Sequence, residues 1–291
     1  MRVPAAAHRP AGSMTATWDV RGYVRGFDAR TGERLWTFHT IPHRGEFGYD
    51  TWPKDAYKYV GGANVWGEIA VDEGRGIVYL PTGSPTYDFY GADRIGANLF
   101  GNCLLALDAR TGKRLWHFQT VHHDLWDYDL PAPPNLITIK RGGKNIDAVA
   151  QITKMGMVFV FDRETGEPIF PIEERPVPAS DLLGEEVWPT QPFPTKPLPF
   201  VRHTFSKNDI TNISEEANRF VSAQIKDAKF GSIFIPPSTQ GVVQFPGTRG
   251  GGEWGGASFD PETGVMFVNA NEIPMFITMA QVEHPEQNEL L

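Results

Sequence analysis

The sequence has 291 residues, of which 41% are hydrophobic and 21% charged, proportions that are ordinary for a globular protein. Its 30 glycines and 24 prolines favour turn-rich β architecture over a helical bundle. The net charge of −8 argues against nucleic acid as a partner, because phosphate binding needs a basic face, and no run of 18 apolar residues is present that could span a membrane.

The first residues contain no apolar stretch of signal-peptide length. Taken alone, this indicates a cytoplasmic protein or a reading frame whose true start lies upstream. The one cysteine, Cys103, excludes an internal disulfide framework.

A nine-residue phrase recurs along the chain. Residues 28–36 read DARTGERLW and residues 108–116 read DARTGKRLW. Weaker copies start at Asp162, with Phe170 in place of the tryptophan, and at Asp260, and a looser relative starts at Asp72. The Asp can accept hydrogen bonds from its own turn and the Gly supplies a positive φ, so each copy predicts a β-hairpin. The strong copies start about 80 residues apart, which fits four-stranded propeller blades with long insertions.

Two stretches break this pattern. Residues 168–199 contain nine prolines, which predict an extended loop over the propeller surface and exclude a central strand. Residues 214–230 are predicted to form one inserted helix, capped by Ser214. Four apolar residues share one face of this helix: Ala217, Phe220, Val221 and Ile225.

Four further segments carry side chains suited to a binding site. They place Trp66 in GGANVWG (61–67), Asp127 and Asp129 in VHHDLWDYDLP (121–131), Lys154 in ITKMGMVFVFDR (152–163), and Trp254 and Asn271 in the stretch 250–272. Each side chain also has an ordinary structural explanation. A strand tryptophan is commonly part of the core, a loop rich in His and Asp is commonly a hydrogen-bonded turn, and a turn lysine is commonly exposed.

Together, the repeats and these four segments resemble the PQQ-dependent (quinoprotein) dehydrogenases, an eight-bladed β-propeller family whose repeat is called the tryptophan-docking motif. The resemblance is strongest to the membrane glucose and quinate dehydrogenase branch. It implies an all-β fold, a partial propeller that covers about half of the eight blades. The expected organisation is a non-family N-terminal extension (1–20), the partial propeller (21–278) and an acidic tail (279–291).

The resemblance also implies roles for individual residues. Trp66 would be the floor on which the planar quinone of pyrroloquinoline quinone (PQQ) stacks, since an indole offers a broad π-face. Asp127 would be the catalytic base that removes the substrate hydroxyl proton, and Lys154 would donate to the quinone oxygens and stabilise the charge that develops there. Asn271 would contact a carboxylate of the cofactor, with Trp254 nearby as a binding or packing residue.

Metal binding follows from the same resemblance, because PQQ enzymes hold Ca²⁺ against the quinone as a Lewis acid. Where the family has an asparagine ligand, eighteen residues after the stacking tryptophan, this sequence has Ser84, whose hydroxyl is a weaker ligand. Asp127 and Asp129 would complete the set. A second Asp marks the lanthanide-using methanol oxidisers, but glucose-oxidising relatives also carry it, followed by Leu-Pro as here, so Ca²⁺ is expected and a lanthanide is the lesser option.

The expected function is therefore that of a PQQ-dependent dehydrogenase, or a fragment of one, which oxidises a sugar, polyol or alcohol. Its partners would be that small molecule, a quinone or cytochrome electron acceptor, and missing blades or another chain to close the propeller. The family implies a periplasmic location. The isolated chain is expected to bind PQQ poorly or not at all. Two alternatives remain: a non-catalytic propeller scaffold and an inactive truncated pseudoenzyme.

Overall fold

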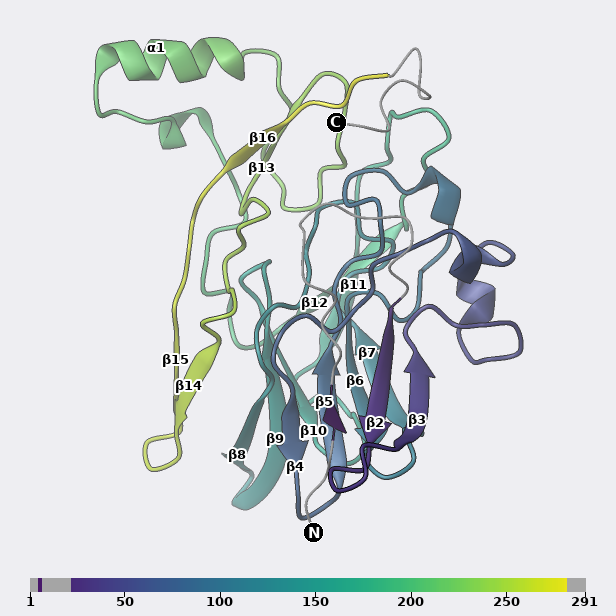
Figure 1. The fold of residues 1–291 in the computed structure, drawn as a ribbon. Helices are drawn as coiled ribbons and strands as arrows, with labels where there is room; N and C mark the ends of the chain where they lie inside the picture. The colour runs from purple at the N-terminus through teal and green to yellow at the C-terminus, as the bar shows by residue number, and fades with distance from the viewer. Residues whose placement is uncertain (1–4, 7–21, 282–291) are drawn as a thin grey trace.

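A computed structural model describes residues 5–6 and 22–281 of the protein (Figure 1). Most of the expected N-terminal extension and most of the acidic tail lie outside the described residues. The described part is built from antiparallel β-sheets with one α-helix, and its sheets do not close into a ring. The predicted all-β partial propeller is confirmed.

One complete four-stranded blade lies in the middle of the structure, with its strands hydrogen-bonded in chain order. The strands are β4 (Ala70–Asp72), β5 (Ile77–Pro81), β6 (Cys103–Asp108) and β7 (Arg114–Gln119). The turns at Asp72 and Asp108 lie at one end of this blade, as the repeat predicts. The long connections that follow β5 and β7 therefore lie at the opposite end.

Partial blades flank the complete one on both sides. The first contains β1 (Ala5–Ala6), β2 (Tyr23–Phe27) and β3 (Arg34–His39), and the second contains β8 (Asn135–Arg141), β9 (Lys144–Ile152) and β10 (Val158–Asp162). The backbone of Ile169 bonds to Val160 at 2.8 Å and extends the second sheet. A further hairpin, β14 (Ala257–Asp260) and β15 (Val265–Val268), starts another sheet beside β8.

The tryptophans of the repeat join neighbouring blades. The indole nitrogen of Trp36 donates to the carbonyl of Ala109 at 3.1 Å, and that of Trp116 donates to the carbonyl of Arg163 at 3.0 Å. Each indole covers the glycine of the next turn so closely that a Cβ on Gly112 or Gly166 would lie 2.5 or 2.6 Å from it. The repeat therefore specifies both the hairpin and its contact with the preceding blade.

The core lies between the blades. Strand β6 is buried on both faces, because alternate side chains point to opposite neighbours. Leu104 and Ala106 pack with Trp116 on one side, and Leu105 and Leu107 pack with Trp36 on the other.

The two interruptions of the repeat differ in part from their predictions. The proline-rich stretch contains a hairpin, β11 (Ile172–Pro176) and β12 (Thr190–Pro194), in a separate two-stranded sheet. It therefore adds no central strand to a blade, and the expected extended loop is limited to the residues before, between and after these two strands. The helix α1 (Glu215–Gln224) is shorter than predicted. Ser214 does cap it, accepting from the Ala217 amide at 3.1 Å, but Phe220 is 65% exposed. The chain leaves the helix where Ile225 packs with Phe205 and Val243.

The remaining elements are short. They are β13 (Val242–Gln244), which pairs with β16 (Met275–Ile277), and the 3-10 helices Tyr49–Thr51, Ala56–Lys58, Ala92–Arg94 and Lys207–Asp209. No helix among the described residues is long and apolar enough to cross a bilayer.

Candidate functional site

The predicted site residues gather at one end of the blades. Trp66 precedes β4, Ser84 follows β5, Asp127 and Asp129 follow β7, and Lys154 follows β9. Because adjacent strands are antiparallel, these four connections lie at the same end, opposite the Asp-x-x-x-Gly turns. Residues separated by almost ninety positions in the sequence thus lie together.

Lys154 is the centre of this site. Its Nζ lies 3.3 Å from Asp127 Oδ2 and 3.1 Å from Asp129 Oδ2, and it also donates to the carbonyl oxygen of Asp127 at 3.0 Å. The lysine side chain is only 5% exposed. A buried ammonium that bridges two carboxylates fixes all three side chains relative to one another.

Trp66 lies beside this ion pair. Lys154 Nζ is 5.9 Å from the centroid of the Trp66 ring, and Trp254 approaches the same ring edge-on, with centroids 6.0 Å apart. Gly83 passes so near that a Cβ there would lie 2.9 Å from Trp66 Nε1 and would overlap Asp129 Oδ1. The structure therefore brings the Trp66 indole, the Lys154 ammonium and the two Asp carboxyl groups into one site. A glycine is required at position 83 because any larger residue would collide with Trp66 and Asp129.

Ser84 connects the site to a buried carboxylate. Its backbone N–H donates to Asp129 Oδ1, and its hydroxyl donates to Asp124 Oδ2. Asp124 also accepts from the amides of Trp126 and Tyr128, both at 2.8 Å, and from Asn102 Nδ2 at 2.9 Å. The sequence did not single out Asp124 or Asn102, although Asp124 stands inside the phrase that carries Asp127.

The two central carboxyls differ in their electrostatics. Burial, followed by the charge of Asp129, raises the pKa of Asp127. Burial also opposes ionisation of Asp129, but Lys154 and the hydrogen bonds to this carboxylate hold its pKa below the ordinary value. Burial lowers the pKa of Lys154, but the two aspartates outweigh it and raise this pKa overall. Lys154 therefore stabilises the ionised form of Asp129 most, and the ionised form of Asp127 binds a proton more tightly than an ordinary aspartate does.

Two further carboxyls that the sequence did not indicate belong to the surroundings. Burial, with Asp129 and Asp124, raises the pKa of Asp88 to about 6. Burial, with Asp129 adding to it and Lys154 opposing it, raises the pKa of Glu253 to about 7. In the sequence they are marked only by their position: Asp88 lies four residues after Ser84, and Glu253 directly precedes Trp254.

The negative charge of these carboxyl groups suits a bound cation, but the number of side chains arranged as ligands is small. Several carboxyls lie near Lys154 or Asp129. Burial, the largest cause, raises the pKa values of Asp88, Asp124 and Asp127, and the charge of Asp129 adds to it in each case. Asn102 Oδ1 is buried without a hydrogen-bond partner. However, among the described residues no group of three or more His, Cys, Asp and Glu side chains is arranged to hold a metal ion. A cation here would need oxygen ligands beyond Asp127, Asp129 and Ser84.

Asn271 and Trp254 lie at the margin of the site. Trp254 is 71% exposed although its ring meets Trp66. Asn271 is exposed and is connected through the backbone: its N–H donates to the Gly251 carbonyl at 3.0 Å, and the Gly251 N–H donates to the Lys154 carbonyl at 2.5 Å. Both are thus near the predicted cofactor position, with their side chains open to solvent.

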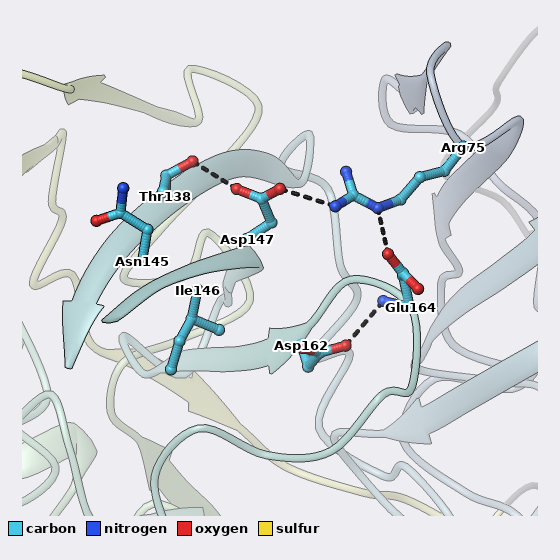
Figure 2. A pocket seen from close by; sticks show the side chains of 7 residues that line it. All are labelled: Arg75, Thr138, Asn145, Ile146, Asp147, Asp162 and Glu164. Carbon is cyan, nitrogen blue, oxygen red and sulfur yellow. Dashed lines mark hydrogen bonds and ion pairs between the residues drawn. The ribbon is translucent and has the colours of Figure 1, made fainter. Parts of the chain in front are cut away.

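A separate hollow of about 510 Å³ lies at the opposite end of the blades (Figure 2). Arg75, from the β4–β5 turn, extends across it to Asp147 at 2.8 Å and Glu164 at 2.7 Å, and it also pairs with Asp72 at 3.0 Å. Its guanidinium therefore connects two blades, and this hollow shares no residue with the Lys154 site. The other lining residues are Thr138, Asn145, Ile146 and Asp162.

Comparisons with known proteins agree with this geometry. Residues 9–290 match the family model described as "PQQ: Glucose/ethanol/alcohol dehydrogenase, beta-propeller domain". The quinoprotein glucose dehydrogenase of Escherichia coli (strain K12) is 38% identical over 91% of this chain and 33% of its own length. The glycerol dehydrogenase large subunit of Gluconobacter oxydans (strain 621H) is 34% identical over 89% of this chain and 35% of its own length.

Solved structures give the same picture. The quinohemoprotein alcohol dehydrogenase from Comamonas testosteroni superposes with a TM-score of 0.61 at 25% identity, over 89% of this chain and 35% of that protein. A europium-containing methanol dehydrogenase superposes with a TM-score of 0.63 at 25% identity, over 88% of this chain and 41% of that protein.

The chain spans about a third of the length of the curated relatives that it matches. Within that span, the docking tryptophans, the blade order and the family match over nearly all residues agree. The chain belongs to the family of PQQ-dependent dehydrogenase β-propellers.

Proposed function

We propose that this chain forms the central part of a PQQ-dependent dehydrogenase that oxidises a sugar, polyol or alcohol, with Asp127 as the general base. The observation that carries the proposal is the position of Lys154 Nζ, which contacts both Asp127 and Asp129 and lies 5.9 Å from the Trp66 ring centroid. A lysine with a purely structural role would need one buried acidic partner, whereas Lys154 contacts two carboxyl groups and lies beside the flat ring of Trp66.

Each side chain has a distinct task in this proposal. Bound PQQ would supply hydride acceptance, which no protein side chain provides. Asp127 would take the hydroxyl proton of the substrate, and its raised pKa makes the ionised form a stronger base. Lys154 would hold positive charge where negative charge develops, Trp66 would orient the ring, and Trp254 and Asn271 would contact the outer edge of the cofactor.

For the metal we propose Ca²⁺, held by Asp127, Asp129 and, more weakly, Ser84. The excess of buried carboxyls supports a cation, and the hydroxyl of Ser84 retains a lone pair while it donates to Asp124. A lanthanide is the lesser option. Activity that appears with La³⁺ and is absent with Ca²⁺ would reverse this assignment.

The electron acceptor would be a quinone or a cytochrome, and the protein would work in the periplasm, by likeness to its family. Further blades, from additional sequence or another chain, would be needed to enclose the site. One alternative is an inactive truncated pseudoenzyme, which would keep the fold and lose the chemistry. A non-catalytic scaffold would not require Lys154 to bridge two buried aspartates.

Equilibrium dialysis of the purified chain against PQQ and Ca²⁺ tests the proposal. We expect weak binding, with a Kd of about 1 mM, equivalent to roughly −4 kcal/mol. Lys154→Ala and Trp66→Ala should abolish it, whereas Lys207→Ala, at an exposed lysine, should leave it unchanged. PQQ binding that is equal in all four proteins would refute the site, and tight binding with dye-linked alcohol oxidation would show that the chain needs no further blades.

A further inference from the structure

The inserted hairpin β11–β12 contacts the segment that carries Asp127 at two buried points. Gln191 on β12 forms two hydrogen bonds with the backbone of His122, accepting from its N–H at 2.8 Å and donating to its carbonyl at 2.7 Å. Glu185, in the loop between the two strands, lies 2.8 Å from His123 Nε2. The side chains of Glu185 and His123 are 0% exposed, and Gln191 is also 0% exposed.

Both ring nitrogens of His123 have buried hydrogen-bond partners. Nδ1 lies 3.0 Å from the carbonyl oxygen of Gly96, which can only accept, so Nδ1 carries a hydrogen. It also lies 3.0 Å from Asn98 Oδ1, which is an acceptor because Arg94 donates to it at 2.9 Å. On the other side, Nε2 faces a carboxyl.

That carboxyl belongs to Glu185, which has two hydrogen-bond partners. Burial opposes its ionisation, but hydrogen bonds from His123 and from the Gly91 N–H hold the pKa of Glu185 below its ordinary value. The second carboxylate contact, at 2.8 Å to His123 Nε2, joins the two side chains in a buried hydrogen-bonded pair. The other charged groups that act on Glu185 or border the pair are Arg94, Asp93 and Asp124.

The segment held in this way has an unusual backbone. His123 has φ 44° and Asp127 has φ 55°, in the left-handed region that side-chain-bearing residues rarely adopt. Asp124 lies between them, and its carbonyl accepts from Arg94 Nη2 at 2.6 Å. Such conformations persist only where the surroundings hold them, and the hairpin supplies two of the contacts that do so.

We propose that Glu185 and Gln191 are positioning residues, which hold residues 122–129 in the backbone conformation that sets Asp127 against Lys154, through the buried hydrogen bond between Glu185 and His123 and the two hydrogen bonds of Gln191 to the His122 backbone (the amide clamp). The relevance to catalysis rests on the proposed function, but the clamp itself is a property of this chain. Loss of the contacts made by the β11–β12 hairpin should free residues 122–129 and leave the blades intact, because the docking tryptophans, Trp36 and Trp116, lie elsewhere.

The first experiment observes the protein without substitution. In the ¹⁵N-histidine-labelled 291-residue chain, we expect the ring N–H of His123 to exchange slowly with solvent, because both ring nitrogens are buried and hydrogen-bonded, and in Glu185→Gln this exchange should be at least tenfold faster. A His123 ring N–H that exchanges freely with solvent in the unsubstituted protein would overturn the buried pair, whatever happens to the variants.

The second experiment follows the segment by hydrogen exchange. The amides of Trp126 and Tyr128 are bonded to Asp124 and report on the loop. In Glu185→Gln they should exchange at least tenfold faster, while amides of β5 and β6 stay protected. Glu186→Gln, the same change at the exposed neighbour, is the matched control and should behave as the parent. If Glu185→Gln fails to fold, Gln191→Met gives the same readout through the second contact.

Unchanged exchange in both Glu185→Gln and Gln191→Met would overturn the clamp. A PQQ titration separates this result from the proposed function. If exchange rises as expected and PQQ binding falls at least tenfold in Glu185→Gln but not in Glu186→Gln, both proposals hold. If exchange rises and PQQ binds measurably but equally to the parent, Glu185→Gln and Lys154→Ala, the clamp stands and the proposed cofactor site fails.

Discussion

The carboxylate of Asp129 accepts from two elements that are 70 residues apart in the sequence: Ser84 N–H on Oδ1 and Lys154 Nζ, at 3.1 Å, on Oδ2. One small side chain thereby joins the loops that follow β5, β7 and β9. Since the lysine is nearly buried, the site depends on this pair remaining intact.

Lys154→Met should therefore destabilise the fold as well as remove PQQ binding. Without the ammonium, Asp129 and Asp127 would be two buried carboxyls with no cation, and breaking a buried pair by removing one partner costs about 3–5 kcal/mol. Urea denaturation followed by tryptophan fluorescence measures the change. Lys207→Met, at an exposed position, should stay within about 0.5 kcal/mol of the parent, as surface substitutions usually do. A Lys154→Met protein as stable as the parent would contradict this account.

Gly166→Ala tests the docking of one blade on the next. The new Cβ would lie 2.6 Å from the Trp116 ring, at a residue with φ 74°. Gly264→Ala is the matched control, because Gly264 has φ 72° and nothing within 4 Å of the added Cβ. Both variants pay the cost of left-handed backbone, so the additional loss in Gly166→Ala, expected at about 1–3 kcal/mol from overpacking, measures the docking contact. Equal losses in thermal unfolding would show that the indole contact contributes nothing.

Gly83→Ala should damage the site with little backbone cost. Its Cβ would lie 2.9 Å from Trp66 Nε1 and overlap Asp129, while its backbone has no positive φ. We expect PQQ binding to fall at least tenfold, equivalent to about 1.4 kcal/mol. Gly74→Ala, whose nearest neighbour is a side-chain oxygen at 3.5 Å, should bind as the parent does. Undiminished binding by Gly83→Ala in the same dialysis assay would place the cofactor elsewhere.

His117 should make stability depend on pH. Burial, followed by the charge of Arg114, lowers its pKa from 6.5 to about 4. The folded state thus favours the neutral ring, so its contribution is fully present above pH 6.5 and is lost as the pH falls toward 4, where the unfolded chain binds a proton that the folded chain does not. In His117→Phe, which can keep the edge contact with Phe100 seen at 5.0 Å, the free energy of unfolding should fall less over this range. Parallel curves for the two proteins in urea melts would refute the assignment.

The sequence by itself determined the hairpins and the way in which blades meet. Each repeat carries its own turn: Asp108 accepts the amides of Arg110 and Thr111, and Gly112 takes the left-handed φ of 69°. These interactions are local, so nine residues are enough to specify them. The closing Trp of each strong copy then docks on the turn of the next blade. The approximate site could be predicted because its four phrases resemble those of the PQQ-dependent dehydrogenases.

The tertiary structure decided what depends on contacts between distant segments. Prolines predicted that residues 168–199 could not form a central strand, but only the folded chain shows that Glu185 reaches His123 across 62 positions. The hydroxyl of Ser84 turns to Asp124, and helix α1 ends where Ile225 meets its core partners. A local sequence pattern predicts the backbone conformation of its own residues. Whether a charge or a hydroxyl is buried depends instead on the distant residues that pack against it in the folded blades.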